Sequence, residues 1–317
     1  LWRHDNSTLS RVDVERWVVI NDFFARVNPG LRLGDTANDM VVMGDTLYIA
    51  VSVSRTIEVL QVSTGKWLGR MRFDGVKHEP RSIVIANDTT AFCTNLNDDS
   101  ITEFNPRTLQ IRTTRISVGP APEGIAATRR YIIVANSGFG DFRATEPKAG
   151  TLSVLDIATH REIRTMSGFV NAGDIITNRT KTRIYAAYRH LPSQRDSLGG
   201  IVELDAESLQ ELRRWRMKSP FALTLSITGD TLFYLSNNAV YCLALQEPHT
   251  QPMLAVQNEE PHAMWYGLAV HPESSELWIC NARDFSVQGE MIIVRLGRAL
   301  PLRRFDVGLN PNTVVFF

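Results

Sequence analysis

The stretch GDTANDMVVMGDTLYIAVSVSRTIEVLQVSTGK, residues 34–66, contains three short runs of apolar and polar residues that are separated by two turns. Alternation with a period of two, bounded by Gly, Asp and Ser, is typical of half-buried β-strands. The fold therefore depends on whether this stretch is a single sheet or one copy of a unit that recurs along the chain.

The unit recurs along the whole chain. One apolar position from each copy marks the repeat at intervals of 42 to 50 residues: Met40, Ile83, Ile125, Ile175, Leu223, Leu268 and Val314. The residues after Val314 and the first 40 residues together make one more repeat of normal length. Residues 1–317 are therefore predicted to form a single all-β domain, a seven-bladed β-propeller of four-stranded antiparallel blades. The ring would be closed by the C-terminal strand joining the N-terminal blade.

Composition narrows the class of protein. The chain is 44% hydrophobic and 21% charged, and its 34 basic and 34 acidic residues cancel, so nucleic acid is not expected as a partner. No apolar run reaches the length of a membrane-spanning helix, and no transmembrane segment is expected. The three cysteines, Cys93, Cys242 and Cys280, lack metal-type spacing and are predicted to be buried free thiols.

Several segments carry a resemblance to a known family. VGPAPEGIAAT (118–128), VANSG (134–138) and SVLDIAT (153–159) resemble the YVTN-type propeller repeat. Between about residues 30 and 180 the order of such segments is similar to that of extracytoplasmic YncE-like propellers, closest in pattern to the cobalamin-binding surface lipoproteins that serve outer-membrane vitamin B12 uptake. After residue 180, FALTLS and WYGLAV depart from this pattern.

The resemblance implies a location and a ligand. It implies a protein of the periplasm or cell surface that captures a small or medium-sized ligand, a corrinoid in this branch, and passes it to an outer-membrane transporter. Because residue 1 is Leu and not Met, a processed start is expected, and a lipid anchor ahead of Leu1 is compatible with the resemblance.

Propeller topology places the binding surface on one face. The loops that enter the inner strands share that face with the connections between second and third strands, and three of these connections are long: 137–150, 189–200 and 281–290. Aromatic and arginine side chains suit recognition, because they offer rigid area and planar donors. The predicted ligand-binding residues are Asn38, Asp39, Arg81, Glu123, Phe142, Arg143, Asn171, Arg189, Phe221, Trp265, Tyr266, Arg283, Phe285 and Asn312.

Trp265 and Tyr266 are the most distinctive of these residues, because the other repeats carry small or polar residues at this place. Both are expected to face solvent and to stack on a flat ligand, with Phe142 or Phe285 closing over it. Trp265→Ala should then weaken binding with little effect on the melting temperature. The alternative is that Trp265 only fills the central channel.

Two other functions remain open. One is a protein-interaction scaffold, because propeller faces commonly bind other chains. The other is a hydrolase or lactonase with a metal ion in the channel, held by oxygen ligands from Asp39, Glu79, Glu123, Asn171, Asp174 and Asn312. Pairing of the glutamates with arginines of neighbouring blades, such as Glu123 with Arg81, would instead neutralise them. No catalytic sequence motif is present, so a non-enzymatic protein without metal or cofactor is preferred.

Overall fold

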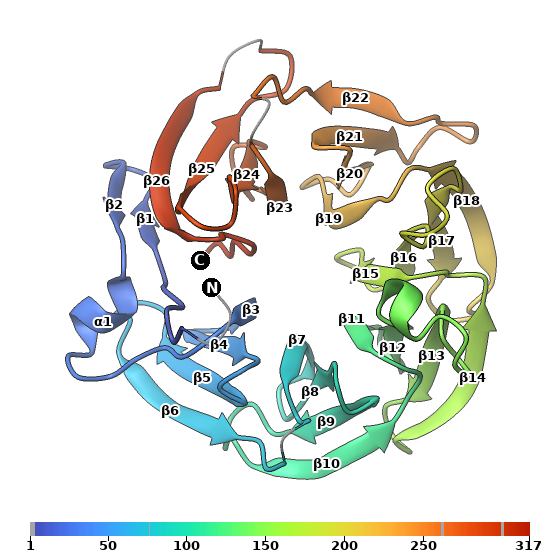
Figure 1. Ribbon diagram of the computed structural model, residues 1–317, viewed down its shortest axis with the longest axis horizontal. Coiled ribbons are helices and arrows are strands. Elements are labelled where there is room, and N and C mark those ends of the chain that lie inside the picture. Colours follow the sequence, from blue (N-terminus) through green and yellow to red (C-terminus); the bar gives the residue numbers. More distant parts are fainter. Residues whose placement is uncertain (1–3, 76, 261–262, 299–300) are drawn as a thin grey trace.

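Six four-stranded antiparallel sheets surround a central channel in the computed structural model, which describes residues 4–75, 77–260, 263–298 and 301–317 (Figure 1). In each sheet the strands pair in chain order, from an inner strand beside the channel to an outer strand at the rim. The sheets are therefore the blades of a β-propeller, and the prediction of four-stranded blades is confirmed.

The strand bounds follow the repeat read from the sequence. The first blade contains β3 (Ala37–Met43), β4 (Thr46–Val51), β5 (Thr56–Gln61) and β6 (Trp67–Arg72). The second contains β7 (Pro80–Asn87), β8 (Thr90–Asn95), β9 (Ser100–Phe104) and β10 (Ile111–Ser117). The third contains β11 (Pro122–Ala127), β12 (Tyr131–Asn136), β13 (Thr151–Asp156) and β14 (Arg161–Ser167). The short helix η1 (Gly140–Phe142) lies between β12 and β13.

The second half of the ring has the same organisation. The fourth blade contains β15 (Ala172–Thr177), β16 (Arg183–Tyr188), β17 (Gly199–Asp205) and β18 (Glu211–Met217). The fifth contains β19 (Phe221–Leu225), β20 (Thr231–Ser236), β21 (Ala239–Ala244) and β22 (Met253–Val256). The sixth contains β23 (Trp265–Val270), β24 (Leu277–Asn281), β25 (Gln288–Val294) and β26 (Arg303–Leu309).

The stretch 34–66 provides β3, β4 and β5, as its alternation predicts. The tight turn between β3 and β4 contains Gly44, whose φ of 58° lies in the left-handed region that glycine adopts without strain. Every residue of β8 and β9 is buried, whereas the outer strand β10 exposes alternate residues. The middle strands of a blade are therefore sandwiched between neighbouring blades, and the core is a series of apolar layers such as Phe92, Ile101 and Ile132.

The prediction of seven blades is wrong. Among the described residues, β1 (Arg11–Asp13) and β2 (Val18–Ile20) form a separate two-stranded sheet beside the first and sixth blades, followed by α1 (Phe23–Val27). The C-terminal residues 311–317 form no strand, so they do not join β1 and β2 in a sheet.

Side-chain contacts hold the C-terminal segment instead of strand pairing. The Asn312 amide donates hydrogen bonds to the backbone carbonyls of Ala37 and Asn38 in β3, at 3.1 and 3.3 Å. Val314 packs with the apolar core of the sixth blade, and Val315 packs with that of the first. Apolar packing and these hydrogen bonds therefore hold the chain end between two blades, without the strand pairing that the predicted closure of the ring requires.

Cys93 and Cys280 are buried, Cys242 is half-buried, and all three are free thiols, as predicted. No helix in the described part of the chain has the length and apolar character needed to span a membrane.

Candidate functional site

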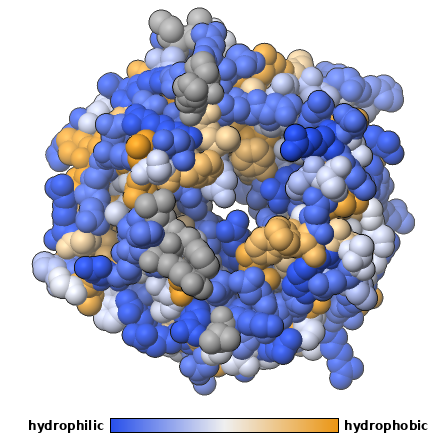
Figure 2. Space-filling model, in the orientation of Figure 1, coloured by the Kyte–Doolittle hydropathy of each residue, from blue (hydrophilic) through white to orange (hydrophobic). Residues whose placement is uncertain are grey.

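Each inner strand has a break in its pairing register near its first residues, close to the opening of the channel. Such bulges turn side chains out of the regular sheet pattern. Figure 2 shows this face of the molecule, with an opening at its centre. We call the residues at or directly before these breaks, with the equivalent residue of the C-terminal segment, the channel ring: Asn38, Arg81, Glu123, Gly173, Phe221, Tyr266 and Asn312.

One part of the channel ring is polar. Arg81 donates a hydrogen bond of 2.6 Å to the side-chain oxygen of Asn38 in the neighbouring blade. Asn312 lies on the other side of Asn38 and bonds to its carbonyl. The structure therefore brings three of the predicted site residues together, Asn312, Asn38 and Arg81, and their bonds link the blades to which they belong.

Arg189 extends this polar part to the fourth blade. Its guanidinium lies 3.4 Å from the Glu123 carboxylate of the third blade. A Cβ atom on Gly173 would touch the same guanidinium at an ordinary contact distance of 3.4 Å, so a side chain larger than that of alanine at this ring position would crowd Arg189. Glu123 is thus paired with Arg189 and not with Arg81, the pairing suggested by the sequence. The Nε atom of Arg189 is buried and has no hydrogen-bond partner among the described residues.

Two aspartates lie behind the polar part of the ring. Burial raises the pKa of Asp39 to about 6, although the backbone N–H groups of Ile83 and Met40 and the charge of Arg81 oppose this shift. Burial also raises the pKa of Asp174, which accepts a hydrogen bond from the backbone N–H of Ala222. Each carboxylate bonds to the inner strand of the next blade, so both connect blades as well as carrying charge.

The opposite part of the ring is aromatic. Phe221 and Tyr266 are half-buried on neighbouring inner strands. The ring of Phe285, from the loop 281–290, meets Tyr266 edge to face with 5.5 Å between ring centres. Of the two phenylalanines predicted to close over a ligand, Phe285 thus lies against Tyr266, and the channel ring has a polar side and an aromatic side.

Trp265 is not where the sequence placed it. Its side chain is only 3% exposed and packs in the core with Phe233, Leu235 and Ile279. Tyr266, at the register break between Trp265 and Gly267, is half-buried, whereas the Trp265 indole is enclosed by the core. The expected solvent-facing indole is therefore a core residue, and Tyr266 alone of this pair belongs to the channel ring.

Three other predicted site residues make their contacts outside the channel ring. Arg143 donates to the carboxylates of Asp99 and Glu146, at 2.6 to 2.7 Å. Arg283 binds Asp306 of the outer strand β26 at 3.0 Å. The Asn171 side chain is buried and donates to the carbonyl of His190. These three groups already have partners within the protein.

The long loops 137–150 and 189–200 are tied together. Asp141 accepts hydrogen bonds from the backbone N–H and the hydroxyl of Ser193, at 2.8 and 2.5 Å. Phe142 is 90% exposed and meets Phe139 edge to face. The two loops thus form one raised edge with an exposed aromatic group, away from Tyr266 and Phe285 in sequence and in blade.

The oxygen groups suggested for a metal ion do not converge in the described part of the chain. No three Asp, Glu, His or Cys side chains there lie close enough to hold a metal ion. Glu123 is paired with Arg189, and Asn171 is bound to the His190 carbonyl. Glu79 accepts a hydrogen bond of 2.6 Å from Asn97.

Gly173 was not among the ligand-binding residues predicted from the sequence. It is the glycine of the channel ring, at a position where the other repeats carry a side chain. An alignment of the repeats by their apolar positions would have shown this gap. The alignment alone would not have shown that Arg189, sixteen residues later, occupies the space.

Solved structures share the fold. A quinonprotein alcohol dehydrogenase-like protein from Bacteroides thetaiotaomicron is similar over 95% of this chain and 74% of its own, with a TM-score of 0.72 and 14% identity. Hydrazine synthase from Kuenenia stuttgartiensis is similar over 84% and 79%, with a TM-score of 0.66 and 14% identity. A chain of a nidogen/laminin complex is similar over 82% and 93%, with a TM-score of 0.55 and 15% identity. Identities this low show a shared propeller fold alone.

The family comparison covers most of the chain. No curated protein matches it. The family model described as "Domain of unknown function (DUF5074)" matches residues 1–296, which include β1 to β25. The chain therefore belongs to the DUF5074 family.

Proposed function

We propose that this chain is a non-catalytic binding propeller that works outside the cytoplasm, in the periplasm or at the cell surface. Its channel ring takes a flat, amphipathic ligand of the corrinoid class and passes it to an outer-membrane transporter. The observation that carries the proposal is the division of the channel ring into a polar side and an aromatic side around one opening. The resemblance of segments 118–128, 134–138 and 153–159 to YncE-like repeats supports the location and the ligand class.

The chemistry of the two sides matches such a ligand. A macrocycle edge or face would pack on Phe221 and Tyr266, with Phe285 fixing the phenol ring. The amide arms of a corrinoid carry both donors and acceptors, so they would pair with Asn38 and with the guanidinium groups of Arg81 and Arg189.

The test is calorimetric titration of the protein with cyanocobalamin. The proposal expects saturable binding of one ligand per chain, and expects that Tyr266→Ala weakens it at least tenfold. Arg283→Ala is the matched control, because this arginine is bound to Asp306 at the rim and should leave the affinity unchanged. Absence of binding by the folded protein, or equal loss in the control, would refute the corrinoid proposal.

A protein-docking role on the same face is favoured by one further observation. Phe142 is 90% exposed, and Phe139 and Leu198 on the two tied loops are 45% and 49% exposed. Exposed apolar side chains held on a constrained loop suit contact with another protein. Phe142→Ser is expected to leave cyanocobalamin affinity unchanged and to lower corrinoid uptake by cells that depend on this protein. Unchanged uptake would argue against docking through this edge.

A further inference from the structure

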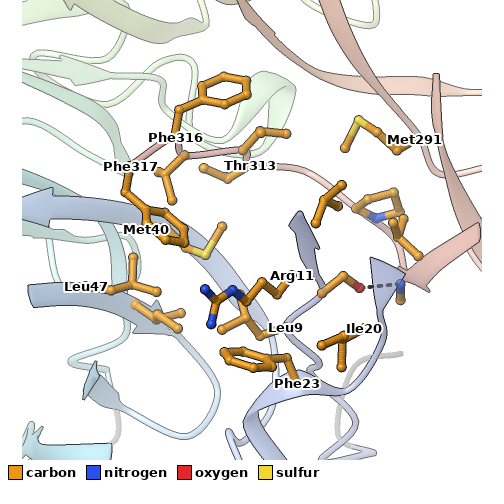
Figure 3. Close-up of a pocket in the computed structure, with 18 of the residues that line it drawn as sticks. Leu9, Arg11, Ile20, Phe23, Met40, Leu47, Met291, Thr313, Phe316 and Phe317 are labelled. Atoms are coloured by element: carbon orange, nitrogen blue, oxygen red, sulfur yellow. Dashed lines mark hydrogen bonds between the residues drawn. The ribbon is translucent and has the colours of Figure 1, made fainter. Parts of the chain in front are cut away.

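Two cavities in the described part of the chain differ in their position. The larger one has a volume of about 740 Å³, and Figure 3 shows Leu9, Phe23 and Met40 among the side chains that line it. Its lining includes Asn312, so it adjoins the channel ring. The smaller one, of about 580 Å³, is a recess at the rim of the fourth blade, and no channel-ring residue lines it.

The recess lies between the long loop 189–200 and the outer strand β18, which Figure 1 shows at the rim of the ring. Its lining comes from the turn before β15, the end of β16, the loop and β18. The lining residues are Gly168, Tyr188, Ser197, Leu198, Arg214 and Arg216. Two guanidinium groups and two hydroxyl groups therefore border one recess, and all four are hydrogen-bond donors.

A polar pair of the repeat is missing behind the recess. In the second and third blades an asparagine at the end of the second strand donates a hydrogen bond of 3.0 Å to the hydroxyl residue opposite it on the third strand. These pairs are Asn95 with Ser100 and Asn136 with Thr151. In the fourth blade the two residues at this place are Tyr188 and Gly200. A phenol thus lies opposite a residue without a side chain.

This exchange directs the phenol towards the outer strand. A Cβ atom on Gly200 would lie 2.6 Å from the Tyr188 hydroxyl oxygen, so the hydroxyl lies where a side chain would begin. Gly200 pairs with Arg216 of β18 in the ladder. Hydrogen bonding to the Glu211 carboxylate and, less strongly, to Tyr188 raises the pKa of Arg214 above its ordinary value, although burial opposes this shift. The Tyr188 hydroxyl therefore faces the arginines of β18.

Arg214 is held in a fixed position. Its Nε and Nη2 atoms donate to the Glu211 carboxylate at 2.9 and 2.8 Å, and its Nη1 atom donates to the Gly168 carbonyl at 3.0 Å. The guanidinium carbon lies 5.3 Å from the ring centres of both Phe169 and Tyr188. A guanidinium that is already positioned in this way loses little conformational freedom when it binds a further acceptor.

Arg216 carries a charge that no described group offsets. Its side chain is exposed, and no hydrogen bond or ion pair joins it to any residue that the structure describes. It lies two residues after Arg214, on the same face of β18, and Glu211 neutralises only one of these two positive charges. The remaining positive charge lies beside the hydroxyl groups of the recess, which suits an anionic ligand.

We propose that this recess binds a phosphate group, carried by a soluble phosphate ester or by a lipid headgroup. Arg214 and Arg216 contact its oxygen atoms, and the hydroxyls of Tyr188 and Ser197 donate to it. Phosphate fits better than a carboxylate, because its oxygens point in several directions and the donors come from β16, the loop and β18. The site lies outside the channel ring, so the inference goes beyond the proposed binding of a corrinoid.

The test is phosphorus NMR of glycerol phosphate, titrated with the whole chain at constant ionic strength. Saturable binding is expected, with a dissociation constant of about 1 mM or lower. Acetate should compete at least tenfold less well, because its planar group reaches fewer donors. Arg216→Gln should weaken the binding of glycerol phosphate at least tenfold, and Tyr188→Phe, which removes only a hydroxyl, at least threefold.

Arg72→Gln is the matched control. Arg72 has the equivalent place on the outer strand of the first blade, where it is exposed and pairs with Thr56, but it lines neither cavity. This variant should bind glycerol phosphate as the natural chain does. Arg216→Gln should keep its melting temperature and its cyanocobalamin affinity, so a failure of this proposal is distinct from a failure of the proposed function.

Vesicles distinguish the two sources of the phosphate group. Sedimentation of the chain with phosphatidylcholine vesicles that contain phosphatidic acid, lost without phosphatidic acid and in Arg216→Gln, supports a lipid headgroup. Binding of glycerol phosphate without sedimentation supports a soluble ester.

Three results would overturn the proposal. The first is the absence of saturable binding of glycerol phosphate by the folded natural chain. The second is an equal loss in Arg216→Gln and Arg72→Gln, which would show unspecific attraction to surface charge. The third is acetate binding as tight as that of glycerol phosphate, which would show a carboxylate site instead.

Discussion

Arg189 reaches Glu123 in the neighbouring blade through the space that Gly173 leaves, and the two charged groups lie 3.4 Å apart. The side chains of Arg189 and Glu123 are 31% and 23% exposed. Water still screens such a pair, so its contribution to folding stability is small, about 1 kcal/mol or less. Its geometric effect is larger, because it fixes the Arg189 guanidinium beside the channel ring.

Arg189→Ala is therefore expected to separate binding from stability. Cyanocobalamin affinity should fall at least tenfold, because a charged donor to the ligand is lost. The free energy of unfolding should change by no more than about 1 kcal/mol, which denaturant titration measures. Unchanged affinity together with a large stability loss would show that Arg189 is only a structural link between blades.

Gly173→Val should have the same effect on binding without removing any charge. A Cβ atom here touches the Arg189 guanidinium at 3.4 Å, so the two methyl groups of valine are expected to push the guanidinium away from Glu123. Calorimetry should show weakened cyanocobalamin binding of a similar size to that in Arg189→Ala. Full affinity in this variant would mean that the position of the guanidinium does not matter for recognition.

The raised pKa of Asp39 predicts that the free energy of unfolding depends on pH. Its pKa is about 6 in the folded chain and 3.8 as the ordinary value, so the folded state holds the proton more tightly. The stabilisation from this proton is complete below about pH 4 and is lost as pH rises through 6; the difference corresponds to up to about 3 kcal/mol. Asp39→Asn keeps an acceptor for the Ile83 N–H and removes the charge.

The difference in unfolding free energy between Asp39→Asn and the natural chain measures the contribution of the Asp39 carboxyl alone. The variant should be the more stable protein at pH 7.5, and the difference should disappear near pH 4, as followed by urea unfolding at each pH. A variant that is equally stable at pH 7.5, or less stable there, would show that ionisation of Asp39 does not lower the free energy of unfolding.

Trp265→Ala is expected to destabilise the fold by about 3–5 kcal/mol, because it removes a large buried side chain from the core of the fifth and sixth blades. Tyr266→Ala, one residue further, should cost much less stability and more ligand affinity. Thermal melting of the two variants gives the contrast directly. A destabilisation by Tyr266→Ala as large as that by Trp265→Ala would place Tyr266 in the core as well.

Gly267→Ala tests how the chain end is held. A Cβ atom there would lie 2.0 Å from the backbone carbonyl oxygen of Asn312, so the C-terminal segment would have to move. Because the φ angle of Gly267 is not in the left-handed region, the effect is steric and not conformational. We expect a lower melting temperature and faster proteolysis within residues 311–317. Unchanged protection of this segment would show that it is not held against β23.

Much of the fold follows from local pattern. The alternation in residues 34–66 predicts β3, β4 and β5, and its recurrence predicts the six complete blades, because a strand buried between two sheets needs apolar residues at fixed places. The same counting predicted a seventh blade and was wrong. Repeat spacing reports how long each unit is, but not whether its strands find partners in space.

For the candidate site, too, one part could be predicted from the sequence and another part depended on the tertiary structure. The sequence by itself determined which residues lie at the inner-strand entrances, including Asn38, Arg81, Glu123 and Tyr266, because the repeat fixes their place in each blade. Only the tertiary structure decided which of them point to the channel and which pair with each other. Trp265 is buried because its indole packs on residues of the fifth and sixth blades, and Arg189 lies beside the channel ring because its guanidinium pairs with Glu123 of the third blade. Such contacts join residues of different blades, and no local pattern records them.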